Sequence, residues 1–204
     1  MSSYGLVSIG SHTGAWLKNQ LIIFKDKKNI LIEPVPYNLL ELKQSVKNSE
    51  NIIIEESAIS DKDETTIFFH VKKESINKLK KHWASGIGSF DKSHLLKHKN
   101  KRFLISESDI EGIKINCLSF SSLVKKYSIK SIEKLMLDVE GAEYKILKSI
   151  DFTNIRIDQI FFEKKHFDGY MEQGKKFEEI RKKLIRNNYK LSNVDDENIL
   201  AEKI

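Results

Sequence analysis

The stretch that decides the fold is LVSIGSHTG, residues 6–14, in which a short apolar run ends at a glycine-containing turn. Such a run is typical of a buried strand, and residues 14–24 continue it with apolar side chains at helical spacing. Further along, residues 29–33 and 52–54 are apolar enough for two more strands, and Pro36 suits the first turn of a helix between them. This alternation of strands and helices with short connections predicts an α/β fold, a doubly wound and mostly parallel sheet.

The rest of the chain continues the alternation without an internal repeat or a low-complexity linker. Strands are predicted at 65–71, 113–118, 132–137, 157–163, 189–194 and 198–204. Helices are predicted at 120–127, from the end of the 132–137 strand to about 149, and around 177–184. Residues 72–102 show no clear long period. The chain is therefore interpreted as a single domain, 1–204, with a basic insertion or loop segment at about 72–102.

Composition places the chain among globular proteins. Of its 204 residues, 40% are hydrophobic and 31% are charged, which excludes a disordered chain. No run approaches the roughly 18 apolar residues of a membrane span. The N-terminus lacks the basic and apolar regions of a signal peptide. The single cysteine, Cys117, excludes an internal disulfide and a thiolate metal cluster. A cytoplasmic location is the default expectation.

The net charge of +6 is concentrated in one part of the chain. Between residues 72 and 102 there are ten basic residues and two acidic ones, whereas the remaining chain has 25 basic and 27 acidic residues. Only four of the 35 basic residues are arginines, the side chain that phosphate recognition favours. The charge therefore predicts a local positive surface, and nucleic acid is not the favoured partner.

The glycine-containing turn indicates which ligand the sheet edge binds. The turn has the pattern G-x-x-x-G from Gly10 to Gly14, and His12 stands where the dinucleotide-binding pattern has its middle glycine. This argues against NAD and FAD and favours a ligand without phosphates, such as S-adenosylmethionine. Gly10 is expected to leave open the space that this ligand crosses.

An acidic residue follows at the distance that ribose binding requires. Glu33 ends the second predicted strand, 19 residues after Gly14. A carboxylate at this place can accept hydrogen bonds from both ribose hydroxyls. The alternative is a solvated carboxylate at a strand end, followed by Pro34.

Four short motifs occur in order along the chain: VSIGSHTG at 7–14, EPVP at 33–36, SAISD at 57–61 and LDVEGAE at 137–143. Together they resemble the FkbM family of S-adenosylmethionine-dependent methyltransferases, and the LDVEGAE motif is the most specific of the four. The resemblance covers about residues 6–166. It implies a Rossmann-like class I methyltransferase fold with about seven strands, of which only the last is antiparallel.

The resemblance also implies which residues contact the cofactor. They are Ser8, Gly10, Ser11, His12, Gly14, Glu33, Pro34, Ser57, Ala58 and Asp138. Two of them depart from the family pattern. Serine at position 8 replaces an acid that helps to hold the methionine ammonium group, and histidine at position 12 replaces an asparagine. Because this acid is missing, a non-catalytic binding protein that kept the fold is an alternative interpretation.

The candidate catalytic residues follow two central strands. Asp138 ends the strand at 132–137, Glu140 comes two residues later, and Glu163 and His166 follow the strand at 157–163. Methyl transfer to an oxygen requires an aligned acceptor and a group that takes the hydroxyl proton. Carboxylates that converge with a histidine also permit a divalent metal such as Mg²⁺. The alternative is a general base without a metal. Glu143 is interpreted as a charge at a helix N-terminus.

Two further histidines lie in the basic segment. His94 and His98 are four residues apart, which places them on one face of a short helix. Lysines surround them in the sequence and no third ligand is in reach, so a solvated basic face is expected rather than a zinc site. Trp83 and the glycine–serine stretch at 85–89 are interpreted either as a substrate-side loop or, for Trp83, as plain core.

These observations predict an O-methyltransferase that acts on a hydroxyl of a sugar or small metabolite. The positive segment makes an acidic acceptor one of the options. The alternatives are a nucleic-acid methyltransferase, which the basic segment suggests, and the non-catalytic binding protein. The Asn/Asp-Pro-Pro-aromatic motif of many nucleic-acid methyltransferases is absent from the sequence. The oligomeric state is not indicated.

Overall fold

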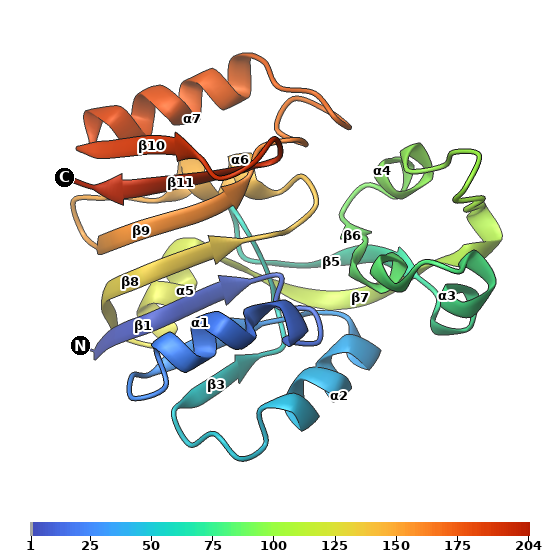
Figure 1. Ribbon diagram of the computed structural model, residues 1–204, viewed down its shortest axis with the longest axis horizontal. Helices are drawn as coiled ribbons and strands as arrows, with labels where there is room; N and C mark the ends of the chain where they lie inside the picture. The colour runs from blue at the N-terminus through green and yellow to red at the C-terminus, as the bar shows by residue number, and fades with distance from the viewer. Residues whose placement is uncertain (1) are drawn as a thin grey trace.

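The computed structural model describes residues 2–204 and contains a seven-stranded sheet at its centre (Figure 1). Its strands are β1 (Ser2–Ile9), β2 (Asn29–Ile32), β3 (Ile52–Glu55), β8 (Ile129–Leu137), β9 (Arg156–Glu163), β10 (Tyr189–Asn193) and β11 (Asn198–Lys203). The spatial order is β10-β11-β9-β8-β1-β2-β3. Only β11 is antiparallel to its neighbours. The predicted fold, with its antiparallel last strand, is confirmed.

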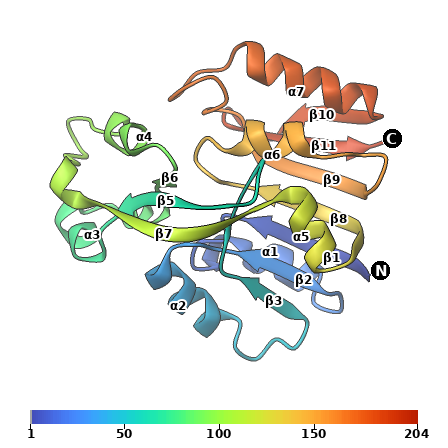
Figure 2. The same ribbon diagram turned by 180° about the vertical axis from the view of Figure 1, so that it is seen from behind.

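Helices cover both faces of this sheet because successive residues of a strand point to opposite faces. The helices are α1 (Lys18–Ile23), α2 (Pro36–Ser45), α5 (Phe120–Lys126), α6 (Glu143–Ser149) and α7 (Lys175–Arg186). Leu6 of β1 belongs to a hydrophobic cluster with residues at the ends of α1 and within α2. Val7, its neighbour, belongs to a cluster with residues of α5, α6 and α7. Figure 1 shows α1 in front of the sheet, and Figure 2 shows α5 and α6 on the opposite face.

A second, smaller sheet projects from the first and was not predicted as a unit. It consists of β4 (Ala58–Ser60), β5 (Glu64–Val71), β6 (Gly88–Ser89) and β7 (Ile110–Ser119), in the order β4-β7-β5-β6. Between β5 and β7 lie α3 (Lys73–Leu79), the 3-10 helix η2 (His82–Gly86) and α4 (Lys92–Lys97). The basic segment is thus folded, and it has its own apolar cluster.

Trp83 lies at the edge of this smaller cluster. Its ring centroid is 4.5 Å from that of Phe103, although 38% of the residue stays exposed. It is therefore only partly a core residue. Among residues 2–204, no helix has the length and apolar character that crossing a membrane requires.

Candidate functional site

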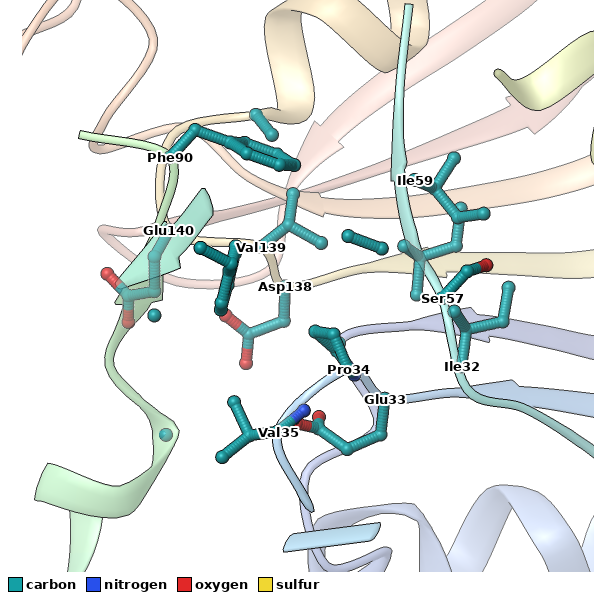
Figure 3. Close-up of a pocket in the computed structure, with 17 residues that line it drawn as sticks. Ile32, Glu33, Pro34, Val35, Ser57, Ile59, Phe90, Asp138, Val139 and Glu140 are labelled. Carbon is teal, nitrogen blue, oxygen red and sulfur yellow. The ribbon is translucent and has the colours of Figure 1, made fainter. Parts of the chain in front are cut away.

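A pocket opens where the carboxyl ends of β1, β2 and β8 meet the smaller sheet (Figure 3). Six of the predicted cofactor-contacting residues line it: Gly10, Glu33, Pro34, Ser57, Ala58 and Asp138. The other four, Ser8, Ser11, His12 and Gly14, are not among its lining residues. Parallel strands end at the same edge, which is why motifs distant in sequence meet here.

Gly10 is required by the backbone. Its φ is +82°, and a Cβ added there would overlap the backbone carbonyl oxygen of Asp138. The turns after β1 and β8 therefore touch through a position where only glycine fits. Gly10 also lines the pocket, so the expectation that it leaves open the space of the ligand stays a prediction beside this backbone requirement.

Ser11 and Gly14 stabilise the turn after β1 on the side that packs against β2 and α2. The Ser11 hydroxyl donates to the carbonyl of Ser8 at 3.1 Å and accepts from the N–H of Ile32 at 3.0 Å. Gly14 has φ +79°, and a Cβ there would lie 2.8 Å from Leu42 Cδ1 of α2. These contacts fix β1 against β2 and α2, so both residues position the turn.

Glu33 is buried and ties the turn to β2. Only 5% of the residue is exposed, so the alternative of a solvated carboxylate is wrong. One carboxylate oxygen accepts from the His12 N–H at 2.8 Å and the other from the Val35 N–H at 3.0 Å. Burial raises the pKa of Glu33 to about 7, in spite of these hydrogen bonds. The oxygen that contacts Val35 also accepts a long hydrogen bond of 3.5 Å from the Asn38 amide, whereas the oxygen that contacts His12 keeps a lone pair for a ligand hydroxyl.

His12 connects this turn to the smaller sheet's side of the pocket. Its backbone has φ +52°. Its Nε2 lies 2.7 Å from the hydroxyl oxygen of Ser85 in η2. Asn38 of α2 donates to the Ser85 carbonyl at 2.8 Å. One polar contact therefore holds η2 against the glycine turn, and a second holds it against α2.

Two buried hydroxyls have no hydrogen-bond partner among the described residues. Ser8 is fully buried in β1, and Ser57 is 4% exposed and lines the pocket. A buried hydroxyl without a partner costs about 1–3 kcal/mol. The unpartnered Ser57 hydroxyl thus offers a hydrogen bond to a pocket ligand. At position 8, by contrast, the structure presents a neutral hydroxyl outside the pocket lining.

Asp138 presents its carboxylate to the pocket. It directly follows β8, and its N–H donates to the carbonyl of Ile9 at 3.0 Å. The sequence suggested a buried carboxylate, but the residue is accessible from the pocket, and no described group pairs with it. Desolvation within the pocket and, next, the Glu140 carboxylate raise the pKa of Asp138 to about 6.

Glu143 holds the turn that carries Asp138 and Glu140. It is 1% exposed, and its two oxygens accept from the N–H groups of Val139 and Gly141, each at 2.8 Å. Burial raises the pKa of Glu143 to about 7. Glu143 is the first residue of α6, the helix N-terminal position that was predicted, and its hydrogen bonds close the turn that precedes the helix.

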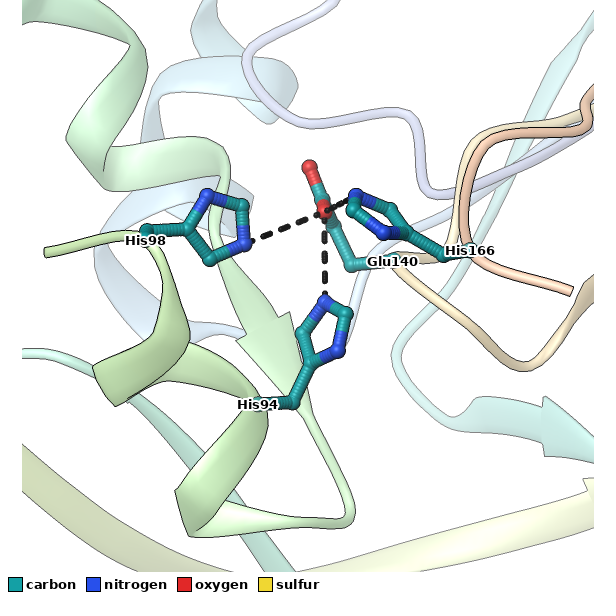
Figure 4. Close-up of side chains that lie close together, drawn as sticks. All are labelled: His94, His98, Glu140 and His166. Carbon is teal, nitrogen blue, oxygen red and sulfur yellow. Dashed lines mark ion pairs between the residues drawn. The ribbon is translucent and has the colours of Figure 1, made fainter. Parts of the chain in front are cut away.

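Glu140 points into a cluster of three histidines (Figure 4). Its Oε2 lies 3.3 Å from His166 Nε2, 3.6 Å from His94 Nε2 and 3.7 Å from His98 Nε2. Burial alone would raise the pKa of Glu140, but the imidazoles outweigh it and hold that pKa well below its usual range. Burial lowers the pKa of His98 to about 4.

The expectation for His94 and His98 is corrected by this cluster. Each residue is only 9% exposed, so neither belongs to a solvated basic face. The face of α4 that carries His94, together with His98 directly after the helix, packs against the turns that follow β8 and β9. Further ligand-type residues, Glu140 and His166, are thus in reach through the fold although they are distant in sequence.

The four predicted catalytic residues divide into two groups. Asp138 and Glu140 line the pocket, whereas Glu163 and His166 are buried behind Glu140 and do not. Glu163 forms an ion pair with Lys165, and burial raises the pKa of Glu163 to about 9. The pocket also has walls from the smaller sheet that sequence reasoning missed, Phe68 and Phe90. Phe68 lies in the predicted strand at 65–71 and Phe90 directly follows the glycine–serine stretch, but no signal in the sequence placed either residue at the pocket.

Comparisons with known proteins agree with this geometry. The family model for the methyltransferase FkbM domain matches residues 8–191. No curated protein matches the chain. A methyltransferase FkbM from Methylobacillus flagellatus KT has a similar structure, with a TM-score of 0.54 at 12% identity over 98% of this chain and 43% of that one.

A fibrillarin pre-rRNA processing protein from Methanococcus jannaschii is also similar, with a TM-score of 0.51 at 12% identity over 99% of this chain and 67% of that one. Identities this low show a shared fold alone. The chain spans less than half the length of the first of these two proteins.

Proposed function

Because the chain belongs to the methyltransferase FkbM domain family, we propose that it transfers the methyl group of S-adenosylmethionine to a hydroxyl of a sugar or small metabolite. The observation that carries this proposal is the pair of carboxylates, Asp138 and Glu33, on one pocket at the carboxyl edge of the sheet. The buried, unpartnered Ser57 hydroxyl in the same pocket supports ligand binding there.

The residues present fit this cofactor. Glu33 accepts hydrogen bonds from the ribose hydroxyls, through the free lone pair of the oxygen that contacts His12 and in place of the long Asn38 hydrogen bond at the other oxygen. Pro34 and Val35 give an apolar wall for the base, and the Ser57 hydroxyl supplies a polar contact. When bound, the cofactor supplies an electrophilic methyl carbon on its sulfonium sulfur.

Asp138 is the proposed general base. Its carboxylate accepts a hydrogen bond from the acceptor hydroxyl and so orients the hydroxyl oxygen toward the methyl carbon of the cofactor. It takes the hydroxyl proton as the oxygen–carbon bond forms and the carbon–sulfur bond breaks, which leaves S-adenosylhomocysteine and protonated Asp138. A pKa near 6 makes this carboxylate a stronger base than an ordinary aspartate while it stays ionised at neutral pH.

The pocket must widen to admit such a ligand. The free space between its side chains is about 50 Å³, below the roughly 300 Å³ at the lower end of ligand pockets. The wall from Gly86 to Phe90 belongs to the smaller sheet, and a Cβ at Gly86 would have no neighbour within 4 Å. Gly88 of the same wall packs on Phe68 and pairs with β5, so we expect the movement on cofactor binding at Gly86 rather than in the whole segment.

Mg²⁺ is not assigned to the pocket. Of the residues that suggested it, Asp138 faces the pocket, whereas Glu140, Glu163 and His166 lie together at the histidine cluster. Mg²⁺ prefers oxygen ligands, and three of the four ligand atoms in that cluster are imidazole nitrogens. The alternative of a general base without a metal therefore fits Asp138 better.

The proposed activity is tested with methyl-labelled S-adenosylmethionine and matched pairs of neutral and acidic sugars. We expect the label in a base-stable methyl ether, because the acceptor is a hydroxyl. Label found only in RNA, or no transfer to any acceptor although the cofactor binds, would contradict the proposal.

Cofactor affinity should depend on pH through Glu33. Ribose hydroxyls donate to the ionised carboxylate, and Glu33 in the free protein is mostly protonated below about pH 7. The affinity for S-adenosylhomocysteine should therefore rise about tenfold from pH 6 to pH 8. Calorimetry at several pH values measures this change.

The variants Glu33→Gln and Glu41→Gln complete the test. Glu33→Gln should bind about 10–100-fold more weakly and lose the pH dependence, because it removes charge-assisted hydrogen bonds. Glu41 is an exposed acid of α2, so Glu41→Gln should behave as the wild type. A Glu33→Gln protein with wild-type affinity and pH profile would remove Glu33 from the site.

The basic segment supports an acidic acceptor. Lys80 and Lys81 directly precede η2, whose last residue, Gly86, lines the pocket. Of the basic residues in this segment, Lys78 and Lys92 pair with Asp109 and Glu107. Most of the positive charge is therefore not neutralised locally, and it can raise the local concentration of an anion.

The KM for the acceptor should therefore rise with ionic strength, roughly threefold or more between low and physiological salt. The triple variant Lys80→Gln, Lys81→Gln, Arg102→Gln should raise KM and leave cofactor affinity unchanged. Its control removes three exposed lysines elsewhere, Lys25, Lys47 and Lys182. Salt-independent kinetics with a neutral acceptor would refute an acidic substrate.

A further inference from the structure

Four metal-ligand atoms converge at the junction between α4 and the main sheet. They are Nε2 of His94, His98 and His166 and one carboxylate oxygen of Glu140, and all lie within 4.8 Å of one another. All four atoms are buried and have no hydrogen-bond partner in the described part of the chain. Buried polar atoms that meet at ion-pair distance but form no hydrogen bond indicate a missing partner at their centre.

The spacing of these atoms fits a metal ion better than direct hydrogen bonds. Glu140 Oε2 lies 3.3, 3.6 and 3.7 Å from the three imidazole nitrogens. Hydrogen bonds from nitrogen to oxygen are roughly 2.7–3.2 Å long. Zinc–nitrogen and zinc–oxygen bonds of about 2.0–2.2 Å in a tetrahedron place the ligand atoms about 3.3–3.6 Å apart. The distances around Glu140 are thus close to the edges of such a tetrahedron.

We propose that His94, His98, His166 and Glu140 bind one divalent transition-metal ion, with Zn²⁺ the best match. Three imidazoles and one carboxylate suit Zn²⁺ and related ions, whereas Mg²⁺ and Ca²⁺ require oxygen ligands. Four protein ligands fill a tetrahedron and leave no open position, which is typical of structural zinc sites. The ion would hold the basic segment against the catalytic edge.

The surroundings of the four ligands suit a closed site. The Tyr170 ring stacks on His166 with a centroid distance of 5.2 Å and contacts His98 edge-on at 4.7 Å. Glu163 lies next to the ligands, with its Oε2 3.8 Å from His166 Nε2. Tyr170 thus covers the ligands with an aromatic ring, and Glu163 places a further carboxylate beside the ligand atom of His166 rather than beside its Nδ1.

One contact has to change when the ion binds. The N–H of Met171 donates to His166 Nδ1 at 3.2 Å. A metal at Nε2 leaves the proton of the neutral imidazole on Nδ1, so this N–H must turn away. Met171 is exposed and lies in a short turn, which can absorb the movement.

The ion would link three parts of the fold that the chain connects only at a distance. His94 lies in α4 and His98 directly follows it, whereas Glu140 follows β8 and His166 follows β9. Glu140 also lines the pocket beside Asp138, and Phe90, four residues before His94, forms another wall. Metal binding would therefore fix the side of the pocket that Glu140 and Phe90 form.

The test is metal analysis of the full chain, purified with a tag that contains no histidine. We expect about one zinc per chain in the wild type. Loss of one ligand in His98→Ala should weaken Zn²⁺ binding at least about a hundredfold. His82 is exposed in the same segment, so His82→Ala should retain wild-type metal content. Co²⁺ in place of Zn²⁺ should give the visible absorption of a tetrahedral nitrogen–oxygen site.

A second variant distinguishes loss of the metal ligand from misfolding of the His98→Ala protein. Glu140→Gln keeps the shape of the side chain but removes its charge, and it should also lose Zn²⁺ while circular dichroism stays that of the wild type. The proposal is overturned if the wild type binds neither Zn²⁺ nor Co²⁺ at micromolar concentration, or if His98→Ala and Glu140→Gln retain stoichiometric metal. These readouts use no methyl transfer, so they stand or fall independently of the proposed function.

Discussion

Asp138→Asn should lower turnover by about 10²-fold or more while it leaves the fold and most of the cofactor affinity in place. The amide keeps the size of the side chain but cannot take the acceptor's proton. No described group pairs with the Asp138 carboxylate, so its replacement breaks no structural contact. Turnover and the Kd of S-adenosylhomocysteine, measured on the same preparation, separate the two effects.

The pH profile adds a second readout for Asp138. Only the ionised carboxylate acts as a base, so wild-type turnover should rise with pH through about 6 and then level off. The Asp138→Asn variant should lack this step. Asp196→Asn, which neutralises an exposed acid far along the chain, is the control. Wild-type turnover in Asp138→Asn would show that another group, or no group, takes the proton.

Gly10→Ala should destabilise the protein by about 3 kcal/mol or more. The added Cβ would overlap the Asp138 carbonyl oxygen, and the backbone is in the left-handed region at φ +82°. Both effects force apart the turns after β1 and β8. For a chain of this size the melting temperature should fall by roughly 6–12 °C.

Gly86→Ala is the matched control for this substitution. A Cβ there would have no neighbour within 4 Å, so its melting temperature should stay close to that of the wild type. If Gly10→Ala melts like the wild type but no longer binds S-adenosylhomocysteine, Gly10 serves ligand space and is not required by the backbone.

The main sheet and its ligand edge could be predicted because their signals are local. The run at 6–14 shows a strand, a turn and a helix start within a few residues, and Glu33 and Asp138 each end an apolar strand. Parallel strands bring such ends to one edge whatever lies between them. The convergence of these two acids on one pocket could therefore be predicted from the sequence.

The histidine cluster could not be predicted because it depends on contacts between distant segments. His94 and His98 indicated one helix face, but nothing in the sequence told which surface that face meets. The position of α4 depends on the smaller sheet, in which β5 pairs with β7 across the whole basic segment. That segment lacks a regular period, so its packing, and with it the partners Glu140 and His166, became visible only in the fold.

At position 8 the motif alone does not tell whether the cofactor binds. The sequence showed that serine replaces the family acid, and the structure adds that its hydroxyl is buried without a partner among the described residues. Cofactor binding by Glu33 and the remaining pocket residues, without that acid, would indicate an enzyme. Its absence would indicate a non-catalytic binding protein that kept the fold.

Calorimetric titration of the wild-type protein with S-adenosylhomocysteine answers this question without any knowledge of the acceptor. We expect binding of one molecule per chain with a Kd below about 1 mM, the upper end of ordinary enzyme–ligand affinities, and no binding of NAD. Absence of heat with S-adenosylhomocysteine at millimolar concentration, or binding of NAD in its place, would show that the pocket is not a methyltransferase cofactor site.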